Sequence, residues 1–140
     1  MSEYIKDIVS SKRNIATSMS AIGVALLTFT IQFFYQRITN NEIPETVVSA
    51  IFATIILSIF CFAVAVLYYQ NSLELCVLRC EDPQMVKDNK NGDLFFFVGF
   101  FSLLFEPAII LWTIKLLFIA LLSLIFWALL LSFVVFRRRS

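Results

Sequence analysis

Residues 94–136 read LFFFVGFFSLLFEPAIILWTIKLLFIALLSLIFWALLLSFVVF, and this stretch decides the fold. Only Glu106, Pro107 and Lys115 interrupt the apolar run. As a single helix it would be roughly 64 Å long, about twice the roughly 30 Å of hydrocarbon in a bilayer. We therefore predict two membrane-spanning helices joined by a tight hairpin near Trp112 and Lys115. One acid, Glu106, lies inside the first of them.

The rest of the chain is almost as apolar. Of its 140 residues, 60% are hydrophobic, and the mean hydropathy is +0.87. This composition is typical of a polytopic membrane protein. Two further apolar runs precede the first stretch, so the predicted fold class is all-α, a single transmembrane domain over residues 1–140. Its four transmembrane helices are expected at 15–35, 47–69, 94–111 and 116–136.

The distribution of lysine and arginine predicts the orientation. Cytoplasmic segments of membrane proteins carry an excess of these residues. With the N-terminus inside, nine of the eleven lie in the segments that would be cytoplasmic, and only Arg37 and Lys115 lie outside. We therefore expect cytoplasmic N- and C-termini, a cytoplasmic loop over residues 70–93, and location in a bacterial inner membrane.

Local signals suggest how the polar segments are organised. Residues 1–13 have apolar side chains at helical spacing, which indicates either a short amphipathic helix on the membrane surface or a polar cap on the first span. Asp82 and Pro83 should end the helix that continues from the second span. The sequence NKNGD at 89–93 is typical of a turn, with Asp93 as the N-cap of the third span.

Two spans carry stripes of small or hydroxylated residues. In the second span, the stripe allows a neighbouring backbone to approach closely, so we expect it to pack against another helix; it consists of Thr54, Ser58, Cys61 and Ala65. In the first span, the stripe either packs against a helix or lines a water-filled path; its most polar members are Thr17, Thr28 and Gln32.

Glu106 is the sharpest single signal. It is the only acid within an apolar run, and Gly99 and Ser102 lie within about 60° of it on the same face of the predicted helix. A carboxylate facing lipid is costly, so it should face protein or water. Three interpretations remain open: it lines a pore or ion path together with Gly99 and Ser102, it forms a salt bridge with Lys115 across the hairpin, or it lies at headgroup level.

The remaining charged residues suggest contacts outside the hydrocarbon. The triplet Arg137–Arg138–Arg139 is expected to anchor the last span at the anionic leaflet. Charges in the 70–93 loop are either solvated or dock a cytosolic protein or a small ligand; these are Glu74, Arg79, Glu81, Asp82 and Lys87.

Several function classes find no support in the sequence. Histidine is absent, and no nucleophile is paired with a base, so we expect no enzyme and no catalytic residues. The three cysteines lack the spacing of a metal site, and we expect no metal and no other cofactor. A net charge of +1 gives no basic surface for nucleic acid.

The function we expect is a homo-oligomeric pore or channel-like effector in the lipid bilayer. Stress-response and anti-phage defence systems use small bacterial membrane effectors of similarly simple construction. The expected role rests on this analogy of architecture alone. The alternative is a non-conducting accessory subunit or membrane scaffold that docks a cytosolic partner through residues 70–93. A proton-coupled carrier is a third class, weakened by the single buried acid and the lack of histidine.

Overall fold

The computed structural model is helical throughout its regular structure and describes residues 2–40, 42–78, 83–113 and 117–139. It contains the helices α1 (Ser2–Thr39), α2 (Glu45–Leu78), α3 (Pro83–Thr113) and α4 (Leu117–Arg139). Each of the four is long and apolar enough to cross a membrane. The predicted all-α class with four membrane-spanning helices is therefore confirmed.

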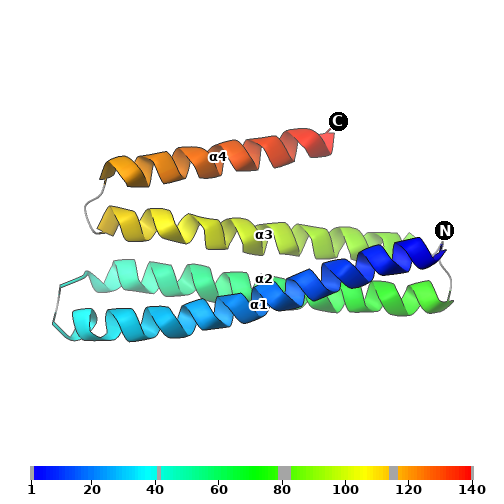
Figure 1. Ribbon diagram of the computed structural model, residues 1–140, viewed down its shortest axis with the longest axis horizontal. Coiled ribbons are helices and arrows are strands. Elements are labelled where there is room, and N and C mark those ends of the chain that lie inside the picture. The colour runs from blue at the N-terminus through cyan, green and yellow to red at the C-terminus, as the bar shows by residue number, and fades with distance from the viewer. Residues whose placement is uncertain (1, 41, 79–82, 114–116, 140) are drawn as a thin grey trace.

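The helices lie side by side in an open arrangement rather than in a closed four-helix bundle (Figure 1). Helix α2 packs against both α1 and α3, and among the described residues α4 packs against α3 alone. The N- and C-termini lie towards the same end of the molecule (Figure 1). α1 and α4 are thus the two edge helices, and each keeps one side free of the chain's other helices.

Three helices extend well beyond the length that a membrane requires. α1 has 38 residues and α2 has 34, so they are roughly 57 and 51 Å long against a hydrocarbon core of roughly 30 Å. α4, with 23 residues, stops short of the end where α1 begins (Figure 1). We call the extension beyond it the polar end; it consists of residues 2–13 of α1, 70–78 of α2 and 83–93 of α3.

The polar end decides between two interpretations and corrects a third prediction. Residues 2–13 are not a separate surface helix but a polar extension of the first span, because α1 is continuous from Ser2. Residues 89–93 are helical rather than a turn, and α3 begins at Pro83, so Asp93 is not an N-cap. Proline is well suited to the first helical position. The three extensions bury apolar side chains against one another, and this packing overrides the turn preference of the sequence; they include Val9, Leu73 and Met85.

Two apolar clusters hold α1 and α2 together. Near the polar end, Val9, Ala16, Ala65, Tyr69 and Leu73 form one buried cluster. At the opposite end, a second cluster surrounds the connection between the two helices; it consists of Phe34, Ile43, Val48, Ile51 and Ile55. The core is therefore split between the two ends, and the exposed apolar side chains between and around them face lipid or a neighbouring protein.

Candidate functional site

A polar network joins three helices at the level where their sequences become apolar. Lys12 of α1 donates from Nζ to Oδ1 and Oδ2 of Asp93 on α3, at 3.0 and 3.1 Å, and to Oδ1 of Asn89 at 3.3 Å. Tyr69 of α2 donates from its hydroxyl to Oδ1 of Asp93 at 2.8 Å. Asp93 therefore accepts from α1 and α2 at once, which fixes the relative position of all three helices.

Tyr69 is seated directly on the backbone of α3. Its side chain is 2% exposed, and a Cβ atom at Gly92 would lie 2.7 Å from its Cε1 atom. Real Cβ atoms do not approach that closely, so only glycine fits at position 92. Lys12 lies over the same ring, 5.9 Å from its centroid. The ring, the glycine and the ion pair form one packed unit.

This network does not follow from the local sequence, which indicates Asp93 only as a helix cap. The pairing depends on how α1, α2 and α3 are aligned along their lengths, which no local pattern in one sequence reveals. One sequence feature does point to these residues. In each of the three helices, the change from polar to apolar sequence occurs close to them: just after Lys12, around Tyr69 and just before Leu94.

The predicted docking residues fall at the polar end where they are described. Glu74 of α2 and Lys87 of α3 are exposed there. Gln70 connects Glu74 to α1, because it donates to Oε1 of Glu74 at 3.2 Å and accepts from Nη1 of Arg13 at 3.0 Å. The other members of the predicted set lie outside the described residues; these are Arg79, Glu81 and Asp82.

The small face of α3 packs against the small stripe of α2. A Cβ at Gly99 would lie 3.1 Å from both the Cβ of Cys61 and the carbonyl oxygen of Ser58. Ser102 donates from Oγ to the carbonyl oxygen of Thr54 at 3.4 Å. Ala65, the fourth member of the stripe, is fully buried. The structure thus brings Gly99 and Ser102 against α2 inside a single chain.

Glu106 lies seven residues after Gly99 and hence on nearly the same face of α3. Its side chain is 6% exposed. Among the described residues, none forms a hydrogen bond or ion pair with its carboxylate. The predicted partner, Lys115, lies outside the described residues. A buried acid without a described partner is costly in a membrane protein and is typical of a functional position.

The predicted path residues of α1 lie elsewhere. Thr17, Thr28 and Gln32 are all exposed, on a side of α1 that contacts none of the chain's other described helices. The two threonine hydroxyls donate to their own helix, to the carbonyl oxygens of Arg13 at 2.9 Å and Val24 at 3.0 Å. The predicted path set is therefore split between an outer face of α1 and an inner face of α3.

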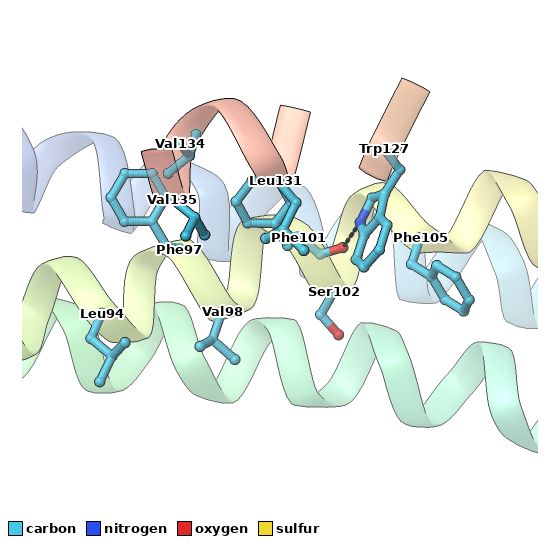
Figure 2. Close-up of a pocket in the computed structure, with 10 residues that line it drawn as sticks. All are labelled: Leu94, Phe97, Val98, Phe101, Ser102, Phe105, Trp127, Leu131, Val134 and Val135. Carbon is cyan, nitrogen blue, oxygen red and sulfur yellow. Dashed lines mark hydrogen bonds between the residues drawn. The ribbon is translucent and has the colours of Figure 1, made fainter. Parts of the chain in front are cut away.

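Trp127 of α4 makes a hydrogen bond and ring contacts to α3. Trp127 donates from Nε1 to the carbonyl oxygen of Phe101 at 2.9 Å, and the two rings are nearly perpendicular with centroids 6.2 Å apart (Figure 2). Beside this contact, an apolar groove of about 510 Å³ separates the two helices. α4 runs to Arg139, so the backbone of the predicted anchor Arg137–Arg139 is helical, while its side chains lie outside the described part.

Within the described residues, no three side chains of His, Cys, Asp and Glu are grouped to hold a metal ion. The chain matches no protein-family model, no curated protein and no solved structure. Any function must therefore be argued from the geometry of the helices themselves.

Proposed function

We propose that copies of the protein assemble in the membrane into a homo-oligomeric pore or channel-like effector, in which α1 faces the conducting path. The observation that carries the proposal is the contrast between two exposed sides of α1. The polar face is small and hydroxylated, and the lipid face is bulky. The polar face comprises Thr17, Ser18, Ala21, Ala25, Thr28 and Gln32, with the larger Val24 and Tyr35 along one edge, and the lipid face comprises Ile15, Ile22, Phe29 and Phe33.

The two faces of α1 are stabilised by different surroundings in a bilayer. Bulky apolar side chains are well accommodated by lipid, whereas small residues allow helices to approach closely and polar groups gain from protein or water partners. α1 is an edge helix (Figure 1), and none of the other described helices covers its polar face, whose side chains are exposed. In a ring of copies, neighbouring subunits would cover the two sides of α1, and its polar face would point towards the symmetry axis of the ring. The middle of the path would then be lined by Ala21 and Ala25, with more polar groups on either side.

Glu106 supports the same proposal from inside the chain. It lies towards the end opposite the polar end, since Ile109 and Ile110 pack on the cluster around Phe34. A buried carboxylate there makes the local potential negative, so the path is expected to favour cations. The cellular setting that we propose is a stress-response or anti-phage effector of a bacterial inner membrane, by analogy with other small membrane effectors.

The first test is the mass of the full-length protein in nanodiscs, by native mass spectrometry or light scattering. A discrete symmetric oligomer is expected. Ion flux is then measured in liposomes for Ala21→Phe, which fills the polar face, and for its neighbour Ile22→Phe on the lipid face. We expect Ala21→Phe to reduce flux at least about tenfold and Ile22→Phe to leave it unchanged. A monomer, or equal flux in the two variants, would rule out a path along α1.

A non-conducting scaffold is the second candidate, and the polar end is the observation that favours it. Three helices project together there and present exposed charges, including Glu74 and Lys87. If this surface docks a cytosolic protein, the double reversal Glu74→Lys with Lys87→Glu should abolish capture of that partner without changing the mass of the assembly. Retained flux in the reversed variant together with lost partner capture would identify docking as a separate property of the polar end.

A further inference from the structure

The groove between α3 and α4 has the shape and chemistry of a lipid site. Its walls are Phe97, Val98 and Phe101 on one side and Leu131 and Val135 on the other (Figure 2). The only hydroxyl among its lining residues, that of Ser102, is already engaged with the carbonyl oxygen of Thr54. The groove therefore offers no free polar group to a ligand, and only a hydrocarbon chain or an apolar helix suits it.

The length of the groove matches one leaflet of the membrane. Its lining on α3 extends from Leu94 to Phe105, which is roughly 17 Å along the helix axis. Half of the hydrocarbon core is roughly 15 Å thick. Leu94 is the first apolar residue after the polar end of α3. The groove therefore begins at the membrane boundary and ends near the middle of the bilayer.

The mouth of the groove adjoins a cationic segment. Val134 and Val135 line it on α4, and the helix continues directly into Arg137, Arg138 and Arg139. Three consecutive arginines at the boundary of the hydrocarbon attract anionic headgroups, with about 1 kcal/mol for each charge near the surface. A chain lying in the groove would place its headgroup at this same level.

We infer that the groove binds one acyl chain of an anionic phospholipid, whose phosphate-bearing headgroup is held at Arg137–Arg139. A lipid suits this place better than an apolar helix from another copy, because a lipid joins a hydrocarbon chain to an anionic headgroup beside the three consecutive arginines. The lipid would fill the space beside Trp127, because α3 is the only one of the described helices that α4 contacts. The inference is independent of the proposed pore.

The two tryptophans of the chain provide a reporter and its matched control. Trp127 lines the groove, whereas Trp112 lies outside it and is 56% exposed. The full-length variant Trp112→Phe is reconstituted in phosphatidylcholine vesicles that contain increasing fractions of brominated phosphatidylglycerol, and the quenching of Trp127 is recorded. The variant Trp127→Phe gives the same measurement for Trp112, and brominated phosphatidylcholine replaces phosphatidylglycerol in a parallel series.

For Trp127, we expect quenching by the anionic lipid to exceed quenching by the zwitterionic lipid at least about threefold at equal mole fraction. Trp112 should follow the bulk composition. The triple change Arg137→Gln, Arg138→Gln and Arg139→Gln, at the chain end, should bring the preference at Trp127 to about one. Val98→Phe, at a position that is already 45% exposed, should narrow the groove and reduce quenching by both lipids. Equal quenching by the two lipids at Trp127, or a preference that survives the triple change, would overturn the inference.

Discussion

Lys12 of α1 and Asp93 of α3 form an ion pair, with 3.0 Å between Nζ and Oδ1, and join two helices that share few other contacts. Tyr69 of α2 donates to the same carboxylate at 2.8 Å. The three helices are thus tied at one level, at the boundary between the polar end and the apolar spans. This junction therefore fixes the position of α1 relative to α2 and α3 at that level.

The ion pair should contribute modestly to stability, and Asp93 should matter more than Lys12. The two side chains are 32% and 27% exposed, and pairs accessible to water are typically worth about 0.2–1 kcal/mol. Asp93→Ala also removes the acceptor of the Tyr69 hydroxyl, so it should cost about 1 kcal/mol more than Lys12→Ala. Equilibrium unfolding of both single variants and the double variant in detergent measures these costs and their coupling.

The matched control for this cycle is Lys90→Ala, which removes an exposed lysine from the same stretch of α3. It should leave the free energy of unfolding unchanged within about 0.5 kcal/mol. The coupling between Lys12 and Asp93 should weaken in high salt, because partly exposed charges are screened. Zero coupling at low salt would mean that the pair does not join the helices in solution.

Gly92 should tolerate no side chain. Alanine normally favours a helix over glycine by about 1 kcal/mol. At position 92, however, the added Cβ would meet the rigid ring of Tyr69 at 2.7 Å. Overpacking of this kind costs typically about 1–3 kcal/mol, so we expect Gly92→Ala to be destabilising overall. Thermal unfolding followed by size-exclusion chromatography measures the change. A more stable Gly92→Ala variant would contradict the seating of Tyr69 on α3.

The sequence predicted the membrane-spanning helices because their signal is local and large. A run such as 94–136 is too long and too apolar for any other structure, so the four helices follow from bilayer thickness alone. Residues 89–93 show where local reasoning failed. Their preference against the helix amounts to a few tenths of a kcal/mol for most residues and about 1 kcal/mol for Gly92, and packing of Met85 and Gly92 against α2 outweighs it.

The candidate sites were harder to predict because they depend on which faces of the helices contact one another. Glu106 and Gln32 were both assigned to a path because they are polar, but Glu106 faces inwards and Gln32 faces outwards. Helical periodicity places residues on a common face without saying what that face touches. The small stripe around Ser58 was recognisable because close backbone approach requires small side chains on consecutive turns. Its partner, the Gly99 face of α3, followed only from the structure.

Trp127 should control whether α4 stays docked. Its indole donates to the carbonyl oxygen of Phe101 at 2.9 Å, and hydrogen bonds between membrane helices contribute about 0.6 kcal/mol on average and up to about 1.7. Trp127→Phe keeps an aromatic ring but removes this bond. We expect faster backbone hydrogen exchange in α4 and no change in α1 and α2. Phe126→Leu, at a neighbouring side chain that is 65% exposed, serves as the control.

Glu106 should lower the free energy of unfolding of the protein. Its side chain is 6% exposed and has no hydrogen bond or ion pair with a described residue. Glu106→Gln preserves the shape of the side chain and removes the cost of burying a charge. We therefore expect the free energy of unfolding to rise, by on the order of 1 kcal/mol. The same variant should lower the permeability ratio of cations to anions in liposomes, because it removes a negative charge whose field acts on the proposed path from inside the chain.

The combination of these two readouts separates the interpretations of Glu106. A functional charge predicts a variant that is more stable and less cation-selective, which is the usual trade-off at a functional site. A salt bridge predicts the opposite for stability, since removing one partner of a buried pair costs about 3–5 kcal/mol, with flux unchanged. Glu3→Gln, at an exposed acid of the polar end, controls for the loss of one negative charge and should alter neither readout. Lower stability with unchanged flux in Glu106→Gln would show that this residue has no influence on the proposed path.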